Sequence, residues 1–474
     1  MTRDRSAAGG ALMRDDERAA LDSALSVALG EPVTIHASQR LSAGASRRTW
    51  ALELHLVDGA TRSVVLQREL PGGVRAAAGM AGEAELLRAA ADQGVPVAPV
   101  VASDGGPGGP GDVLGAWIVL DHVDGETIPR RILRDDEFEG ARARLVEQCG
   151  QALAGIHRIP LDRAAGLASG DQVDQFRGVL DAFGDPHPAF EIAFRWLGAN
   201  RPVDAPSEAV VHGDFRMGNL IVDGGGLRAV LDWELAHLGD PAEDLGWFCS
   251  RAWRFGSPLE AGGVGTVTDL LEAYRSAGGR SLDVDDVRWW QVLGTLKWGI
   301  MCIVQASRHQ SGASRSVELA AIGRRVAETE EDVLALIDGP SDQVLSVAVA
   351  GDIPPSTGVP IGPHVRPSAA ELLDAVSEYL ATVRDEVPGR LGYHARVAGN
   401  VVDLVGRELD LGPAVATAHR ARLDTLGVAD DDALAAGLRS GDVDWTDPTV
   451  RRAVRASVRD TLAIAHPGYW EVPS

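Results

Sequence analysis

The chain reads Val211-His212-Gly213-Asp214-Phe215-Arg216-Met217-Gly218-Asn219 and, after a short interval, Leu231-Asp232-Trp233-Glu234. The residues in between predict a tight hairpin, because two apolar runs, 220–222 and 227–231, flank the turn sequence Gly224-Gly225-Gly226. A hairpin brings its two ends together. The side chains of Asp214, Asn219 and Asp232 are therefore expected to converge on one spot.

These side chains have the chemistry that phosphoryl transfer requires. A carboxylate can orient a hydroxyl nucleophile and accept its proton, while an amide oxygen and a second carboxylate suit Mg²⁺. Asp214 is therefore the predicted general base, and Asn219 and Asp232 are the predicted metal ligands. Arg216 lies close to the base and either neutralises the transferring phosphate or is an ordinary surface arginine.

Protein kinases place the same roles in the same order, as His-Arg-Asp-x-x-x-x-Asn followed by Asp-Phe-Gly. The His-Gly-Asp and Asp-Trp-Glu variants found here resemble the aminoglycoside phosphotransferase and choline kinase-like family. They are most similar to bacterial phosphotransferase family proteins that resemble the kinase domain fused to some acyl-CoA dehydrogenases. The resemblance covers residues 31–338 and includes Gly239-Asp240-Pro241-Ala242-Glu243-Asp244-Leu245.

The resemblance implies a two-lobed, protein-kinase-like α+β fold, with a small β-rich lobe and a mainly helical lobe. It implies ATP and Mg²⁺ as cofactors, and transfer of phosphate to an alcohol group of a small hydroxylated molecule. We expect a tail and helix at 1–30, the small lobe at 31–126, the large lobe at 127–338, a Pro/Gly-rich linker at 339–367 and a separate all-helical domain at 368–474.

Two features of the later segments are predicted in more detail. Residues 315–337 are expected to form one amphipathic helix that closes the large lobe. Ser368-Ala-Ala-Glu371 is a predicted capping box at the start of the helical domain, which resembles a small domain of unknown function.

The resemblance also implies a nucleotide site in the small lobe. Gly44-Ala45-Ser46 resembles the loop over the ATP phosphates, where small residues let backbone N–H groups and a hydroxyl approach. Asp121 and Val123 lie in the segment that matches the adenine-contacting hinge, and we expect them to act through backbone groups.

The strand that supplies a phosphate-binding lysine in kinases has none here, and reads Val64-Val65-Leu66-Gln67-Arg68. Successive strand residues point to opposite faces, so only one of Gln67 and Arg68 can face the nucleotide. Simple alignment favours Gln67 and charge favours Arg68, which we prefer. Glu83 is the expected partner of that residue on the following helix.

His212, Asp240 and Asp244 are expected to support the site without reacting. His212 precedes the base and suits a role in backbone geometry. Asp240 and Asp244 match the family's aspartates after the metal hairpin, and they either hydrogen-bond the catalytic loop or simply cap a helix.

Tryptophan is concentrated after the hairpin. Six of the eleven are Trp233, Trp247, Trp253, Trp289, Trp290 and Trp298, with Arg251 and Arg254 among them. Most of such a cluster is expected in the core. A subset can wall an apolar slot in which Arg251 or Arg254 pairs with an anionic group. That combination favours a hydroxyacyl-CoA acceptor, and the resemblance to dehydrogenase-fused kinases points the same way.

Two alternatives stay open. The net charge of −23 favours a cationic acceptor, as in an aminoglycoside or choline-type kinase. The missing strand lysine favours a catalytically weak nucleotide-binding scaffold that acts through its C-terminal helices. Retention of Asp214 opposes the scaffold, because a binding module needs no base.

Composition limits the class of protein. A length of 474 residues predicts two or three domains, and the acidic charge argues against nucleic-acid and membrane partners. Cys149, Cys249 and Cys302 lie far apart, which predicts reduced thiols in a cytoplasmic protein. Lys297 is the only lysine, and the oligomeric state has no signal in the sequence.

Overall fold

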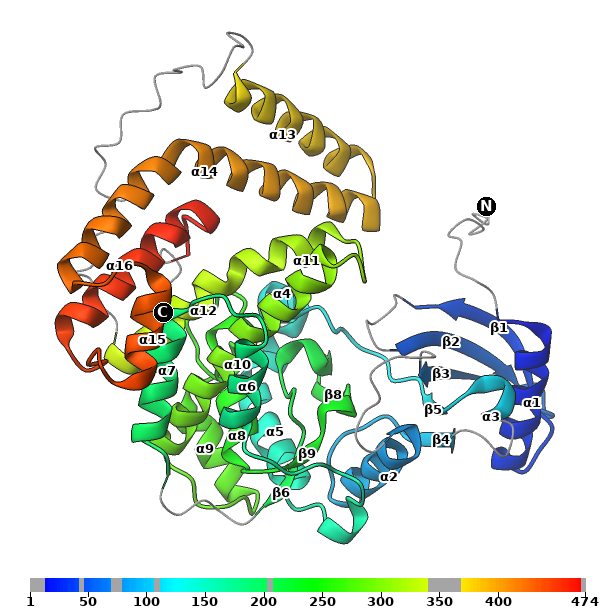
Figure 1. The fold of residues 1–474 in the computed structure, drawn as a ribbon. Coiled ribbons are helices and arrows are strands. Elements are labelled where there is room, and N and C mark those ends of the chain that lie inside the picture. Colours follow the sequence, from blue (N-terminus) through cyan, green and yellow to red (C-terminus); the bar gives the residue numbers. More distant parts are fainter. Residues whose placement is uncertain are drawn as a thin grey trace.

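The computed structural model describes residues 13–41, 47–69, 79–105, 111–202, 208–339 and 368–469. These residues form a β-rich N-lobe, a mainly helical C-lobe and a helical C-terminal region (Figure 1). The two-lobed α+β fold predicted from the sequence is confirmed, and so is the all-helical C-terminal region.

The N-lobe is built on an antiparallel five-stranded sheet in the order β1-β2-β3-β5-β4. Its elements are α1 (Asp15–Leu29), β1 (Thr34–Arg40), β2 (Arg47–His55), β3 (Thr61–Glu69), α2 (Gly79–Asp92), β4 (Val100–Asp104), α3 (Gly111–Leu114) and β5 (Trp117–Asp121). Alternate residues of β5 enter two different clusters: Trp117 and Val119 pack with α1, whereas Ile118 and Leu120 pack with α2. The sheet therefore separates an α1 face from an α2 face.

The C-lobe surrounds two short β pairs with helices. β7 (Leu220–Asp223) and β8 (Gly226–Val230) form the predicted hairpin, and β6 (Ala209–Val211) pairs with β9 (His237–Gly239). The helices are α4 (Pro129–Arg134), α5 (Glu139–Ile156), α6 (Gln172–Asp181), α7 (Pro188–Ala199), α8 (Ala242–Phe248), α9 (Val267–Ser276), α10 (Val284–Gln310), α11 (Val317–Ile322) and α12 (Val326–Asp338). The buried helix α10 runs beside α8 and α12, and so connects the hairpin region to the end of the lobe.

The predicted helix at 315–337 is divided in the structure. A 3₁₀ turn at Gly323–Arg325 separates α11 from α12, so the prediction of one continuous helix is wrong. At Gly323 the chain lies against α10, where a Cβ would come within 2.7 Å of the Ala306 Cβ. The turn also lets Arg325 stack over Trp298 at 5.8 Å. Tertiary contacts thus override the local helical pattern.

The C-terminal region contains four helices within the described residues. They are α13 (Ala369–Glu386), α14 (Arg390–Leu426), α15 (Asp431–Ser440) and α16 (Pro448–Ala465). α13 and α14 form an arm, and α15 and α16 pack against α7 and α12 of the C-lobe (Figure 1). The Ser368 capping box is confirmed, since the side chains of Ser368 and Glu371 bond each other's backbone N–H. No helix in the described ranges is long and apolar enough to cross a membrane.

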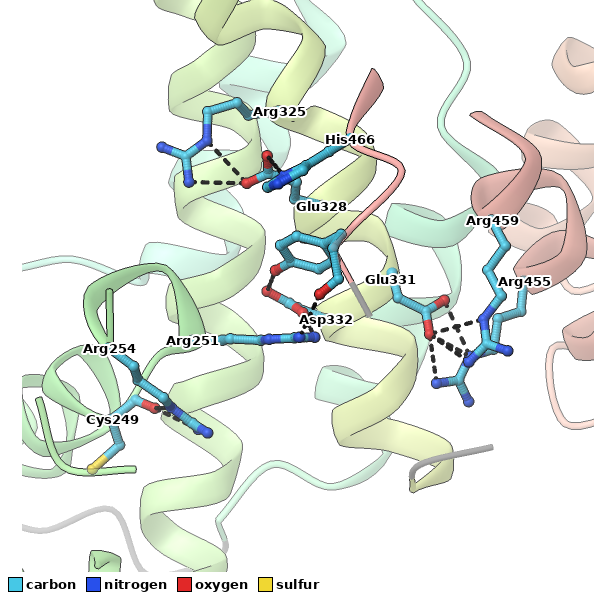
Figure 2. Close-up of polar contacts among 11 residues, drawn as sticks. Cys249, Arg251, Arg254, Arg325, Glu328, Glu331, Asp332, Arg455, Arg459 and His466 are labelled. Carbon is cyan, nitrogen blue, oxygen red and sulfur yellow. Dashed lines mark hydrogen bonds and ion pairs between the residues drawn. The ribbon is translucent and has the colours of Figure 1, made fainter. Parts of the chain in front are cut away.

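Acidic residues of α12 hold the C-terminal region on the C-lobe (Figure 2). Glu331 accepts hydrogen bonds from Arg455 at 2.8 Å and from Arg459 at 2.9 Å, both on α16. Glu328 bonds His466 at 3.0 Å. The contact between the C-lobe and the C-terminal region, called the seam below, also contains a hydrophobic cluster to which both contribute. Apolar packing therefore joins the two units as well as charge.

Glu331→Ala is expected to destabilise the protein by about 3–5 kcal/mol, because it leaves the buried guanidinium of Arg455 without a carboxylate to balance its charge. Urea unfolding measures this loss. Glu378→Ala on the exposed side of α13 is the matched control and should change the unfolding midpoint little. Equal midpoints for the two variants would contradict the importance of this ion pair.

Asp332, next to Glu331, gives the seam a pH dependence. Burial raises the pKa of the Asp332 carboxyl to about 6, against the opposing effects of Arg251 and the Tyr469 hydroxyl. Between about pH 4 and pH 6 the Asp332 carboxyl is therefore protonated in the folded protein but ionised in the unfolded chain. The free energy of unfolding consequently falls as the pH rises through this window. Asp332→Asn should gain stability relative to wild type from pH 4 to pH 7, by at most about 3 kcal/mol. A pH-independent difference in urea unfolding would sink this prediction.

Candidate active site

The loop that carries Asp214 leaves β6 through a tight turn at Gly213. Gly213 has a φ of 78°, and a Cβ there would lie 2.5 Å from the carbonyl oxygen of Leu235. Only glycine fits this close approach without strain. The turn presses the start of the loop against the segment that follows Asp232, which brings the two motifs together.

Asp244 fixes the same turn from the first part of α8. Its buried carboxylate accepts the backbone N–H of His212 at 2.8 Å and that of Gly213 at 2.9 Å, and it lies 3.1 Å from His157 Nε2. Burial alone would raise the pKa of Asp244, but hydrogen bonds and the nearby histidines hold it below its usual value. Asp240 instead accepts the N–H of Ala242 at 2.9 Å, which is a helix-capping contact.

The Asp214 carboxylate is held by three side-chain donors. Trp247 Nε1 donates to Oδ1 at 2.9 Å, Asn219 Nδ2 donates to Oδ2 at 2.7 Å, and Arg216 Nε lies at 2.9 Å and 3.1 Å from the two oxygens. Asn219 uses its amide nitrogen here, so its amide oxygen is the atom available to a cation. The arrangement fixes the direction of the carboxylate.

Asp232 occupies an unusual backbone conformation at the end of the hairpin. Its φ of 64° and ψ of 66° are left-handed, which costs energy for any residue other than glycine. Asp232 counts as an exposed residue, yet neighbouring protein atoms desolvate its carboxyl group. That desolvation, reinforced by the charge of Glu234, raises the pKa of Asp232 to about 6, while Arg47 opposes the rise. The excess of carboxylates favours a cation at this point.

Arg47 of β2 places a positive charge on the α2 face of the sheet. Its guanidinium pairs with Glu83 of α2 through two bonds of 2.8 Å and 2.6 Å, and it also lies 3.3 Å from Glu234 and 3.2 Å from Gln67. Arg47 is not among the site residues predicted from the sequence. Apolar Trp50 and Leu52 alternate along the same strand toward the α1 face, and that alternation places Arg47 on the α2 face.

Arg68 lies on the opposite face of the sheet. It donates to the carbonyl of Leu114 at 2.8 Å and to Glu17 of α1 at 3.0 Å. This contradicts the preference for Arg68 as the residue that faces the nucleotide with Glu83. Gln67 is on the Glu83 face of the sheet. The expectation that Arg68 faces Glu83 because of its charge is wrong, since Arg47 of the neighbouring strand β2 provides the positive charge there.

Asp121 and Val123, the residues predicted to contact the nucleotide through backbone groups, lie at the end of β5 and just beyond it. The Asp121 carboxylate pairs with Arg62 at 2.7 Å and 2.8 Å, while Val123 packs against a hydrophobic cluster shared by α2, β5 and the C-lobe. These two positions lie where the chain passes between the lobes. Gly44, Ala45 and Ser46 fall outside the described residues.

Three tryptophans form a row beside Asp214. Trp247 lies 5.0 Å from Trp253, which lies 4.9 Å from Trp298, and the Arg216 guanidinium stacks over Trp253 at 4.9 Å. All three rings are largely buried, as expected for most of the cluster. Arg216 is therefore held between the Asp214 carboxylate and the Trp253 ring.

Arg251 and Arg254 are occupied within the protein (Figure 2). Arg251 pairs with Asp332 at 3.2 Å and donates to the carbonyl of Tyr469 at 2.9 Å. Arg254 donates twice to the carbonyl of Cys249, at 3.1 Å and 2.9 Å. The expectation that one of them pairs with an anionic substrate group is contradicted for Arg251, whose charge is already neutralised at the seam.

A model of the phosphotransferase enzyme family matches residues 38–283, just over half of the chain. The chain belongs to this family. The resemblance to this family, inferred from the His-Gly-Asp and Asp-Trp-Glu motifs, is confirmed. Residues 385–469 match a domain of unknown function (DUF6285).

Two curated relatives match parts of the phosphotransferase. Acyl-CoA dehydrogenase family member 11 of Gallus gallus is 28% identical over an alignment of 207 residues, and the match covers 38% of this chain and 26% of that protein. Aminoglycoside 3'-phosphotransferase of Escherichia coli is 27% identical over an alignment of 146 residues, and the match covers 28% of this chain and 52% of that protein. The match thus spans about a quarter of the first relative and half of the second.

Among solved structures, an aminoglycoside phosphotransferase candidate from Ralstonia eutropha superimposes with a TM-score of 0.52 at 17% identity. The superposition covers 66% of this phosphotransferase and 96% of that chain. At this identity the likeness supports the fold alone.

Proposed function

We propose that the chain is a Mg²⁺- and ATP-dependent kinase that phosphorylates a hydroxyl group of a small metabolite, with a hydroxyacyl-CoA as the leading acceptor. One observation carries the proposal: the Asp214 carboxylate is held by Trp247, Asn219 and Arg216 beside the hairpin end that carries Asp232. A binding module would have no use for a carboxylate aimed in this way.

Each residue has a distinct part in the proposed reaction. Asp214 orients the acceptor hydroxyl and takes its proton late in the transfer, and Arg216 lies where it can offset charge on the moving phosphoryl group. Asn219 and Asp232 would hold Mg²⁺, which supplies charge neutralisation at the phosphates. Arg47, braced by Glu83, would contact the nucleotide phosphates in place of a lysine.

The residues present fit a magnesium ion. Within the described ranges no group of three or more His, Cys, Asp or Glu side chains forms a metal cage. Mg²⁺ is usually held by one or two protein groups together with phosphate oxygens and water, so a cage is not needed. The raised pKa of Asp232 reflects burial and negative charge that a divalent cation would offset.

Two candidate acceptor classes have separate support. The relative named acyl-CoA dehydrogenase family member 11 favours an acyl-CoA compound, and the row of tryptophans offers an apolar wall. The relative named aminoglycoside 3'-phosphotransferase and the net charge of −23 favour a cationic sugar. The first is preferred because the aromatic row adjoins the base itself.

Incubation with Mg²⁺ and ATP and a panel of hydroxyacyl-CoAs, aminoglycosides and choline tests the proposal. Mass spectrometry of the small molecules should show a phosphomonoester of a hydroxyacyl-CoA, and a chelator should abolish it. A product from aminoglycosides alone would overturn the acyl assignment. Nucleotide binding without any product would favour the scaffold alternative.

A further inference from the structure

The only lysine of the chain lies beneath the catalytic loop. Lys297 is on α10, and its side chain is 12% exposed. The ammonium group is 3.3 Å from the carbonyl oxygen of Gly213, 3.4 Å from Glu243 Oε1 and 5.0 Å from the centre of the Trp247 ring. It therefore lies in the C-lobe, on the side of the site that holds the base.

Two of these contacts lead directly to Asp214. Gly213 precedes Asp214 in the chain, and its carbonyl direction sets how the next residue leaves the turn. Trp247 donates its indole N–H to Asp214 Oδ1 at 2.9 Å. A cation over the face of an indole ring is attracted to it by about 0.5–2 kcal/mol, so Lys297 also fixes the ring that holds the base.

Glu243 forms an ion pair with the Lys297 ammonium. It is a buried residue of α8 and also lies 2.9 Å from His237 Nε2. Burial alone would raise the pKa of Glu243, but His237 and Lys297 hold it below its usual value. The ammonium is thus neutralised by a fixed counter-charge and cannot swing away toward solvent without leaving that charge unpaired.

We propose that Lys297 is a positioning residue for phosphoryl transfer, which aims the Asp214 carboxylate by holding the Gly213 carbonyl and the Trp247 ring. The inference rests on the proposed function of Asp214. A lysine is better suited than an arginine, because its compact ammonium can bond two oxygens and pack on a ring at the same point. The phosphate-binding charge that kinases take from a lysine comes here from Arg47, which leaves Lys297 this different task.

Kinetics of two variants test the proposal. Lys297→Met should lower kcat by about 10²-fold, the scale expected when a reacting group is misplaced by about 1 Å, with the Kd for Mg-ATP unchanged. Lys297→Arg should recover part of that loss because it keeps the charge. An unchanged kcat, or a loss confined to nucleotide affinity, would overturn the proposal.

A second measurement needs no turnover. Lysine labelled with ¹³C at Cε gives a single NMR resonance, because the chain has only Lys297. Asp214→Asn should shift this resonance, whereas Asp223→Asn on the hairpin turn should not. An unmoved resonance in Asp214→Asn would overturn the positioning role even if the wild type is an active kinase. If the wild type is inactive with every acceptor but the resonance shifts, the proposed function fails and the contact stands.

Discussion

Asp214→Asn is expected to lower phosphoryl transfer by about 10³-fold while leaving the affinity for Mg-ATP nearly unchanged. Asparagine has the shape of aspartate, and its oxygen can still accept the N–H of Trp247. It cannot take a proton from the acceptor hydroxyl or carry the charge that pairs with Arg216. Steady-state turnover and equilibrium nucleotide binding measure the two quantities separately.

The matched control for this experiment is Asp223→Asn. Asp223 ends β7 in the same hairpin but lies at the turn, away from the base. It should retain wild-type turnover. Turnover in Asp214→Asn equal to that of the control would exclude Asp214 as the base. A parallel loss of nucleotide binding would mean that the variant has disturbed the loop as a whole.

Arg47→Met is expected to weaken Mg-ATP binding by about 10²-fold, the value of losing one strong charge-assisted contact. The substitution also leaves the carboxylate of Glu83 without its partner in a site where it is only 4% exposed. An unpaired buried charge costs about 3–5 kcal/mol, so a lower unfolding midpoint should accompany the binding loss. Arg47→Lys should restore much of the binding, since it returns a cation to the α2 face.

Two arginines close to Arg47 in sequence or structure serve as controls. Arg48 is exposed and is the next residue on β2, and Arg48→Met should bind nucleotide normally. Arg68→Met should loosen the contact with α1 and leave nucleotide affinity intact, because its side chain faces away from Glu83. A large loss of affinity in Arg68→Met together with normal binding in Arg47→Met would reverse our assignment of the phosphate-side charge.

The convergence of the two motifs on one hairpin is predictable because the geometry is local. Asp214, Asn219 and Asp232 are separated by one hairpin, so apolar runs and a glycine turn are enough to predict that they meet. The contact of Asp244 with the His212–Gly213 turn is also predictable, because only a short segment separates Asp244 from the hairpin. The two-lobed fold was predictable because the His-Gly-Asp and Asp-Trp-Glu motifs resemble those of a family with that fold.

The nucleotide half could not be predicted in this way because it depends on contacts between distant segments. Which strand contributes a cation to Glu83 is decided by sheet register, and Arg47 and Gln67 become neighbours only when β2 pairs with β3. The sequence offered Arg251 or Arg254 as the partner of a substrate anion, because the residue that neutralises Arg251, Asp332, lies far along the chain on α12. Local patterns give no signal for either pairing.

Lys297 has a practical consequence for how this protein can be observed. Reagents that find kinases by acylating the lysine beside the nucleotide phosphates would meet Arg47 in the proposed site, so the proposed kinase would escape such surveys. Amine-reactive cross-linkers and dyes would have only Lys297 and the N-terminus to attack. Since the Lys297 ammonium is largely buried against Gly213 and Glu243, acylation there would report on opening of the catalytic loop.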